Sequence, residues 1–336
     1  MEYLVDSNQM KEMDEFTINQ IGIPSMVLME KAAMAVSNKM LEKISNRDSI
    51  LAICGTGNNG ADGVAVARIL KCKGYPVDIF IIGDEKRGSE QLKHQLMIAR
   101  NLDINVLNNA KICEYTVVID ALFGIGLSKP VTGAFATAVE EVNACDNLVY
   151  SVDIPSGIHA GCGQIMEHAI KADYTITFGY RKTGLFLYPG CDYAGEIITE
   201  DIGYSKKAEE FASLDTVMFT KSDLENIPIR EKHSNKGTFG RVLIIAGSHN
   251  MSGACYLSAK AAYRSGAGLV KIITVEENRS IIQSMLPEAI VTTYHPNTLK
   301  NKLEIDRLIS EIQWATAIVF GPGIGISSAT DLLMTL

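Results

Sequence analysis

Short apolar runs alternate with longer amphipathic stretches along the first 180 or so residues of the chain. The runs predict buried strands, and the stretches between them predict helices. Strands are expected at 49–54, 77–82, 115–120, 147–153 and 173–178, and helices at 61–72, 89–100 and 133–145. Strands that stay apolar along their whole length are typical of a parallel sheet covered by helices on both faces. We therefore expect a three-layer, Rossmann-like α/β domain.

Two further helices are predicted before the first strand, over 7–20 and 24–44, with Ser7 and Ser25 as candidate N-caps. Their apolar positions either cover the sheet or mediate association between chains. These positions are Met10, Met13, Phe16, Met26, Leu28 and Met29.

Residues 203–236 are polar and poorly periodic, and the α/β rhythm restarts at Gly240. We expect a first domain at 1–215, a linker at 216–235 and a second domain at 236–336. Predicted strands of the second domain are 241–247, 268–275, 289–294 and 315–320, with helices at 252–265, 277–285 and 301–312. The sequence stops soon after ATAIVF (315–320), where a helix capped by Ser327 or Ser328 has only begun. We expect this domain to be incomplete, the chain to be a fragment, and 315–320 to lie at an exposed sheet edge.

The composition narrows the class of protein. A formal net charge of −8 argues against a broad nucleic-acid surface, which needs a basic face. Seven cysteines without a CxxC pair favour a reducing compartment, and the six histidines lack zinc-ligand spacing. The N-terminus has acids where a signal peptide is basic, and no apolar run reaches roughly 18 residues. We expect a cytoplasmic protein without membrane partners.

Residues 55–60 read GTGNNG after a predicted strand and before a helix, which fits the G-x-G-x-x-G pattern of dinucleotide sites. The pattern alone is as compatible with a glycine-rich turn that binds nothing. It also permits an NAD-dependent dehydrogenase, in which Asp84 at the end of the second strand would bind the ribose. Asn58 and Asn59 argue against that alternative, because a dinucleotide turn has no use for two amides.

Polar side chains follow three of the predicted strands. Asp62 belongs to the first segment, Asp120 ends the third strand, and Asp153 and Ser156 follow the fourth in SVDIPSG. One such aspartate is best explained as a helix N-cap. Because the carboxyl ends of parallel strands share one rim, three such segments together predict a site.

The three segments GTGNNGADGVAVAR, VIDALFGIGLSKPVTG and SVDIPSG together resemble the YjeF-type NAD(P)H-hydrate epimerases, over about residues 1–215. The resemblance implies a substrate, NADH or NADPH hydrated at C6 of the nicotinamide ring, and at least a dimer formed through residues 7–44. It implies a potassium ion bound by Asn59, Asp120 and Ser156, and hard oxygen ligands suit such a cation. The implied substrate-binding residues are Asn58, Asn59, Gly60, Ala61, Asp62, Gly124, Ile125, Gly126, Leu127, Ser128, Lys129, Pro130 and Asp153.

Epimerisation at C6 calls for an acid. If a group protonates the hydroxyl, the ring nitrogen can expel it as water, and water can return to the other face of the iminium. Asp153 is the candidate for this proton shuttle, and Asp120 with the cation would set the local field. Opening of the ring is a second possible route.

Residues 235–274 together with FGPGIG (320–325) resemble the first part of the ADP- or ATP-dependent NAD(P)H-hydrate dehydratases, which have a ribokinase-like fold. The resemblance implies that Ala254 and Gly323 line a hydrate site and that Mg²⁺ and ADP or ATP serve the reaction. The family's GTGD-type catalytic segment has no match in the sequence, so we expect no dehydration by this chain.

A non-enzymatic binding module is the alternative to an enzyme, because YjeF-like domains also occur as binding modules in RNA-processing scaffolds. The presence of Asp120 and Asp153 and the acidic net charge favour an enzyme.

Overall fold

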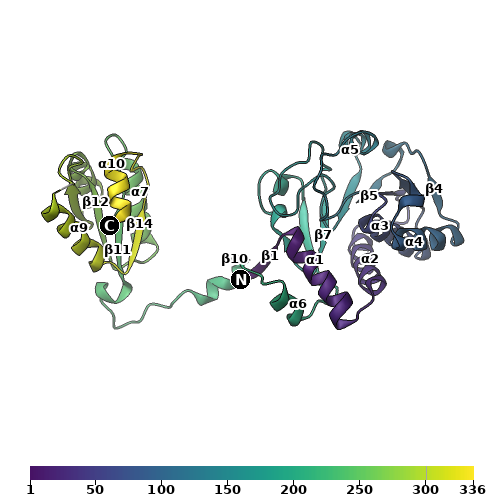
Figure 1. Ribbon diagram of the computed structural model, residues 1–336, viewed down its shortest axis with the longest axis horizontal. Coiled ribbons are helices and arrows are strands. Elements are labelled where there is room, and N and C mark those ends of the chain that lie inside the picture. The colour runs from purple at the N-terminus through teal and green to yellow at the C-terminus, as the bar shows by residue number, and fades with distance from the viewer. Residues whose placement is uncertain (300) are drawn as a thin grey trace. The chain divides into compact units, whose positions relative to one another are not determined.

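The computed structural model describes residues 1–299 and 301–336 and forms two compact units, Met1–Asn226 and Ile227–Leu336 (Figure 1). The division falls within the segment 216–235 that the sequence indicates as a linker.

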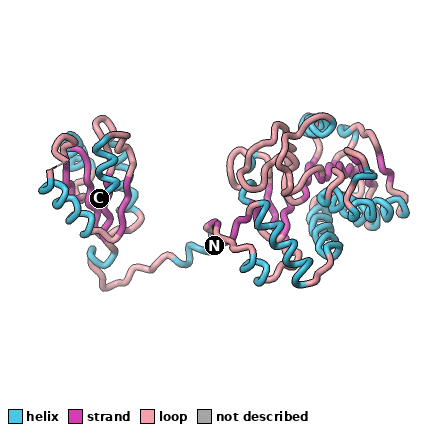
Figure 2. The backbone as a smooth tube through the Cα atoms, viewed as in Figure 1, coloured by secondary structure: helices cyan, strands magenta, loops and turns pink. Residues whose placement is uncertain are grey.

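The first unit is built on a seven-stranded sheet whose neighbouring strands are all parallel, in the order β4-β3-β2-β5-β6-β7-β9 (Figure 2). The five predicted strands are present, and β4 and β9 were missed. β4 has three residues and β9 is only half-buried, so neither carries a strong apolar run. The strands are β2 (Ile50–Cys54), β3 (Val77–Ile81), β4 (Asn105–Leu107), β5 (Val117–Ala121), β6 (Leu148–Val152), β7 (Tyr174–Phe178) and β9 (Glu196–Glu200).

Alternate residues of each strand point to opposite faces of this sheet. Ile50, Ala52 and Cys54 of β2 pack in the cluster that includes α2 (Ser25–Leu41), α3 (Asn58–Cys72) and α4 (Glu90–Asn101). Leu51 and Ile53 pack on the other side with α5 (Ala134–Ala144). Burial on both faces explains the continuous apolar runs and confirms the three-layer α/β architecture.

A second, three-stranded sheet joins the two ends of this unit in the order β10-β1-β8. Its strands are β1 (Glu2–Val5), β8 (Arg181–Lys182) and β10 (Thr216–Met218). α1 (Ser7–Phe16) follows β1, continues as a π-helical turn (Thr17–Ile21), and packs on α6 (Lys206–Phe211). The predicted N-caps are wrong by one residue: the Asp6 carboxylate caps α1, and Pro24 precedes α2 without a side-chain cap.

The apolar residues named for association lie mainly inside the fold. Met10, Met13, Leu28 and Met29 are buried against the same chain. A surface between copies would need other side chains of α2, such as Val27 and Met34, which are 44% and 49% exposed.

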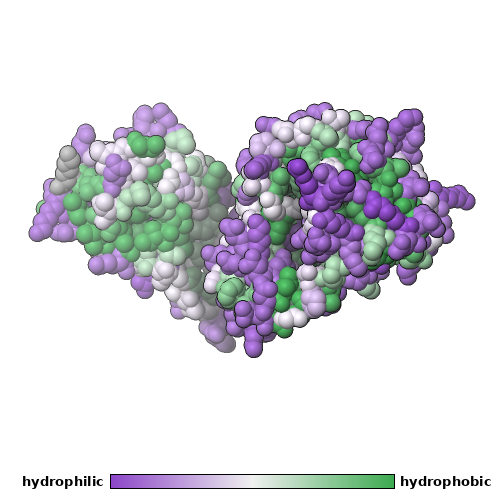
Figure 3. Space-filling model, turned by 45° about the vertical axis from the view of Figure 1, so that its right-hand side comes forward, coloured by the Kyte–Doolittle hydropathy of each residue, from purple (hydrophilic) through white to green (hydrophobic). Residues whose placement is uncertain are grey.

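The second unit contains a four-stranded parallel sheet in the order β13-β12-β11-β14. As expected for the segment 315–320, β14 lies at an edge, and Ile318 and Val319 are 49% and 38% exposed. Figure 3 shows hydrophobic surface on this unit. Its elements are β11 (Arg241–Ile245), β12 (Leu269–Val275), β13 (Ile290–Tyr294), β14 (Ala317–Phe320), α7 (Ser252–Arg264), α8 (Arg279–Met285), α9 (Lys302–Trp314) and α10 (Ser328–Thr335), which Ser327 caps.

Short 3₁₀ turns complete the two units, at Glu85–Arg87, Ile112–Glu114, Thr183–Leu185, Gly190–Asp192, Lys221–Asn226, Lys236–Phe239 and Glu276–Asn278. None of the helices in the described residues is both long and apolar enough to span a bilayer.

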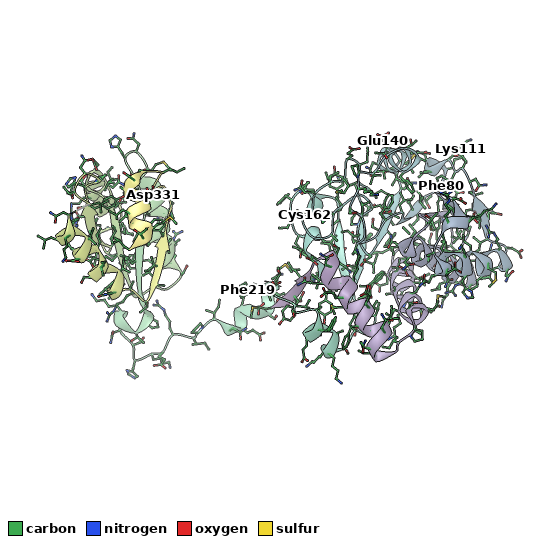
Figure 4. All side chains as sticks on the ribbon, in the orientation of Figure 1. Phe80, Lys111, Glu140, Cys162, Phe219 and Asp331 are labelled. Carbon is green, nitrogen blue, oxygen red and sulfur yellow. A yellow bond between two sulfur atoms is a disulfide. The ribbon has the colours of Figure 1, made fainter. Side chains whose placement is uncertain are left out.

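The expectation of reduced cysteines is wrong for one pair. Cys113 and Cys145 form a disulfide across 32 residues of sequence, with their Cα atoms 5.2 Å apart. The packing of α5 against the 112–114 turn brings the two cysteines together, and their spacing in the sequence does not indicate the disulfide. Cys162, on the loop after β6, is a free and exposed thiol (Figure 4).

Two glycines of the β2–α3 turn give a test of how tightly this turn is packed. A Cβ atom on Gly60 would lie 1.9 Å from the Gly55 carbonyl oxygen, whereas one on Gly57 would meet nothing within 4 Å. We expect Gly60→Ala to lower the free energy of unfolding by about 3 kcal/mol, because backbone must move. Gly57→Ala should cost about 1 kcal/mol or less. Urea denaturation of both variants measures the difference, and equal costs would contradict the close approach.

Candidate functional site

A cavity of about 800 Å³ lies at the carboxyl ends of β2, β5 and β6. The structure thus brings together the three segments that follow these strands. Helices α1 and α2 supply further wall, including Met10, Leu28 and Met29. The predicted residues that line the cavity are Asn58, Asn59, Asp62, Gly124, Ile125, Gly126, Leu127, Ser128, Lys129, Pro130 and Asp153.

Gly60 and Ala61 do not line the cavity. They are buried in the first turn of α3, where Gly60 packs on Gly55 and Gly55 in turn lies against the Leu122 carbonyl. The glycines at 55 and 60 therefore let three pieces of backbone approach one another. This close packing directs the start of α3 toward the cavity.

Asp120 lies beneath the cavity and not in its wall. Its fully buried carboxylate accepts hydrogen bonds from Ser151 Oγ at 2.7 Å, Ser156 N at 2.8 Å and Ser156 Oγ at 2.5 Å. Burial raises the pKa of Asp120, and the Ser156 hydrogen bonds oppose that rise. Asp120 is not among the residues that line the cavity, and its role beside a cation stays a prediction from the sequence.

Oxygen atoms gather around Ser156. Its hydroxyl also accepts from Phe123 N at 2.9 Å and lies 3.3 Å from the Phe123 carbonyl oxygen. The Asn59 side chain packs against Gly124, and its Nδ2 is buried with no hydrogen-bond partner in the described residues. One carboxylate surrounded by neutral oxygens is a donor set for a hard monovalent cation. No cluster of three or more His, Cys, Asp or Glu in residues 1–299 and 301–336 could hold a metal of another kind.

Asp153 enters the cavity from the loop after β6 and is tied to a buried lysine. Its Oδ1 accepts from Lys182 Nζ at 2.5 Å and from Thr177 Oγ1 at 3.2 Å. Lys182 is 1% exposed and donates also to Thr177 Oγ1 and the Phe178 carbonyl, both at 2.9 Å. Asp153 has a φ of +69°, a strained conformation that its surroundings must hold. The side chain is therefore a fixed, charge-paired carboxylate facing the cavity.

Two other carboxyl groups line the cavity without a cation partner in the described residues. Asp62 projects from the first turns of α3, and burial raises its pKa well above the ordinary value, with further contributions from the negative charges of Asp153 and Asp14. Asp14 on α1 accepts a hydrogen bond from the Tyr204 hydroxyl, and burial raises its pKa too. Burial also raises the pKa of Tyr204, which stays a donor.

Lys182, Asp14 and Tyr204 were missed by sequence reasoning. Lys182 follows an apolar strand in a polar turn, where a lysine is ordinarily exposed. Asp14 did carry a signal, because it lies one helical turn from both Met10 and Ile18 on the apolar face of α1, and all three line the cavity.

Asp84, the residue a dehydrogenase would need, is not part of the cavity wall. Its carboxylate accepts from Lys86 N at 3.0 Å and caps its own 3₁₀ turn. In the second unit, Gly323 (φ +65°) packs against Ala254, and Ser248 Oγ donates to the Gly323 carbonyl at 2.8 Å. The two residues expected at a hydrate site are therefore neighbours at the carboxyl ends of β11 and β14.

Comparison with known families divides the chain in the same way. Residues 25–184 match the family described as YjeF-related protein N-terminus, and residues 242–335 match the family described as NAD(P)H-hydrate dehydratase.

Similar proteins are of two kinds. The NAD(P)H-hydrate epimerase of Weissella koreensis is 44% identical over 206 residues, 61% of this chain and 93% of that protein. The bifunctional NAD(P)H-hydrate repair enzymes of Dictyoglomus turgidum and Thermofilum pendens are 35% and 29% identical over 96% of this chain. The chain spans 65% and 63% of their lengths.

A solved structure shares the fold of the first unit. The crystal structure of yeast ynu0 is 22% identical, with a TM-score of 0.55, over 66% of this chain and 97% of the yeast chain.

The Lys182–Asp153 pair should be strongly coupled, because each charge is the main compensation for the other in a buried site. We expect Lys182→Met to lower the free energy of unfolding by about 3 kcal/mol, and Lys182→Met with Asp153→Asn to cost less than the sum of the single changes. The control is Lys93→Met, which removes an ion pair to the exposed Glu90 and should cost about 0.5 kcal/mol or less. Chemical denaturation of the two single variants, the double variant and the control measures these free energies of unfolding. A double variant whose cost equals the sum of the single costs would refute the coupling.

Proposed function

The chain belongs to the NAD(P)H-hydrate epimerase family, and we propose that its first unit interconverts the R and S epimers of NADH or NADPH hydrated at C6. The observation that carries the proposal is the lysine-anchored Asp153 inside a cavity formed by all three strand-end segments. An aspartate held in a strained conformation by a buried lysine is characteristic of a functional site.

The cavity suits a nicotinamide nucleotide in size and chemistry. About 800 Å³ lies within the range of cofactor cavities. Leu28, Met29 and Phe178 offer apolar surface to a ring, and the N-terminus of α3 at Asn58 offers backbone N–H groups to a phosphate. Residues 124–130 would close over the substrate from the other side.

The reaction inverts a carbon that bears both a hydroxyl and the ring nitrogen. Protonation of the hydroxyl allows the nitrogen lone pair to expel water, and addition of water to the opposite face gives the other epimer. Asp153 would move a proton to or from the C6 hydroxyl or the attacking water. Ring opening and reclosure would give the same product.

The oxygen atoms below the cavity support a proposed potassium site. Asp120, Ser156 and Asn59 would hold it, with Asp120 contributing the only full negative charge among them. Bound there, the cation supplies a positive field beneath the reacting ring. Asp120 would thus act through the ion and through the loop that carries Asp153.

The match of residues 242–335 to NAD(P)H-hydrate dehydratases supports a linked role for the second unit. Where the GTGD-type segment is also present, dehydration of the hydrate to NAD(P)H with Mg²⁺ and ADP or ATP would use the Ala254 and Gly323 region, and the present sequence, which has no match to that segment, is expected not to catalyse it. We also propose that the chain self-associates through the outer face of α2.

Epimerase activity is the direct test of the first unit. When the full chain is added to pure (R)-hydrate in potassium buffer, we expect the two epimers to equilibrate faster than in protein-free buffer. Chromatography that separates the epimers follows the reaction. Equal rates with folded protein and without it would refute the proposed function.

Potassium should be required, with Ser156 as one of its ligands. We expect Ser156→Ala to raise the potassium concentration for half-maximal rate by roughly 10–100-fold, through loss of a hydroxyl oxygen. Ser89→Ala is the control, because Ser89 caps α4 and does not line the cavity, and the potassium requirement of this variant should be unchanged. A wild-type rate that is the same in potassium-free buffer would exclude the cation.

A further inference from the structure

Three carboxyl groups line the cavity of the first unit, and their surroundings differ. Asp153 is paired with the Lys182 ammonium group at 2.5 Å. Asp14 accepts a hydrogen bond from the Tyr204 hydroxyl. For Asp62, no residue in the described part of the chain donates a hydrogen bond to the carboxylate or places a cation within ion-pair distance. Two neighbouring carboxyls with such unequal partners are expected to divide the roles of acid and base.

The unequal partners set where a shared proton resides. The Lys182 ammonium group donates to Asp153 Oδ1 at 2.5 Å, so a negative charge on Asp153 has a cation partner. Desolvation at the cavity wall and the negative charges of Asp153 and Asp14 raise the pKa of Asp62 well above its usual range, which favours its protonated form. The charged or titratable groups that share the cavity wall with Asp62 are Asp14, Asp153, Tyr204, Lys11, Lys129 and Lys182, and the Cys54 thiol lies within electrostatic range of its carboxylate.

The fold also separates the two carboxyls in space. Asp62 belongs to the helix that follows β2, and Asp153 follows β6. β5 lies between these strands, so their ends are about 10 Å apart at the usual strand spacing. The two carboxyls therefore enter the cavity from separate segments, and a ring bound between these segments would present a different face to each.

We propose that Asp62 and Asp153 act as an acid–base pair on opposite faces of the nicotinamide ring, with Asp62 as the proton donor and Asp153 as the acceptor. Asp62 protonates the C6 hydroxyl, the C6–O bond breaks, and water leaves as the N1 lone pair forms a C=N bond. A second water attacks C6 from the other face, the π electrons return to N1, and Asp153 takes the proton released. One proton passes from Asp62 to Asp153, and the opposite epimer reacts with the two roles exchanged.

This pair selects one of the two chemical routes. A single carboxyl on one face cannot both expel water there and activate water on the other face. Ring opening would break the C6–N1 bond and carry the original oxygen through as an aldehyde. Loss and return of water instead replaces that oxygen at every inversion. The inference rests on the proposed function. The isotope experiment below distinguishes failure of the acid–base pair from failure of the epimerase function.

The first experiment follows oxygen in ¹⁸O-labelled water with the full wild-type chain. The substrate is pure unlabelled (R)-hydrate, and mass spectrometry of the newly formed (S)-hydrate is taken at low conversion, corrected for the protein-free reaction. We expect one ¹⁸O atom in every (S)-hydrate molecule formed. Newly formed (S)-hydrate that retains ¹⁶O would overturn the pair while leaving the epimerase function intact. Absence of any acceleration would instead refute the function itself.

The second experiment assigns the donor. We expect Asp62→Asn to reduce kcat by roughly 10²–10⁴-fold with little change in KM, and Asp62→Glu to restore part of the rate. The matched control is Asp84→Asn, which removes an aspartate after β3 outside the cavity and should keep the wild-type rate. Asp62→Asn at the wild-type rate would overturn the assignment.

Measurement of the stability of the Asp62→Asn variant at pH 7 tests whether it is folded. Because burial raises the pKa of Asp62, the folded protein loses stability as pH rises from the ordinary carboxyl range through the raised value. Asparagine has no proton to lose, so the variant should be at least as stable as the wild type at pH 7. A variant that is inactive and also less stable at pH 7 would count against the donor role, since Asp62 would then be a structural residue.

Discussion

Asp120 and its serine partners hold the end of β5 to the loop that follows β6. The carboxylate is fully buried, and Ser151 and Ser156 supply the hydrogen bonds that make this burial tolerable. These bonds fix the start of the SVDIPSG segment, which contains Asp153 in its left-handed conformation. Without them a strained aspartate would relax, and the Lys182 ion pair would lose its geometry. The cavity therefore depends on a carboxylate that does not line it.

The charge partners of the site come from outside the βαβ core. Lys182 belongs to β8, which pairs with β1 at the N-terminus of the chain, and Tyr204 follows the last strand of the main sheet. Met10 and Met13 of α1 pack with Ala208 and Ala212 of the same region, and Asp14 projects from that helix into the cavity. The parallel sheet thus positions the acids, and the segments that wrap around it supply the lysine and the hydroxyl that distinguish one acid from another.

The sequence predicted the strands that are buried on both faces and the rim that their carboxyl ends share, because apolar periodicity and glycine-rich turns are local signals. β1, β8 and β10 escaped prediction because they are short and are defined by pairing between residues 2–5, 181–182 and 216–218. Lys182 escaped for the same reason, since its burial exists only when β8 meets β1. The Cys113–Cys145 bond likewise depends on tertiary packing. Asp120 illustrates a subtler limit: its strand-end position was correct, but sequence alone does not distinguish a residue in a cavity wall from one beneath it.

A half-buried carboxyl with neither a cation nor a hydrogen-bond donor in the described residues carries a cost in stability, and Asp62 is in such a position near the start of α3. An asparagine there would avoid the cost of ionisation and keep the size of the side chain. Proteins retain such locally unfavourable groups mainly where function requires them, and the nearby Lys182 could have been placed to neutralise Asp62. It is instead held by Asp153, Thr177 and the Phe178 carbonyl, which use all three of its N–H donors. The lysine is thus committed to one acid, and the other acid has no cation partner in the described residues, which favours its protonated form, as proton transfer across a ring would require.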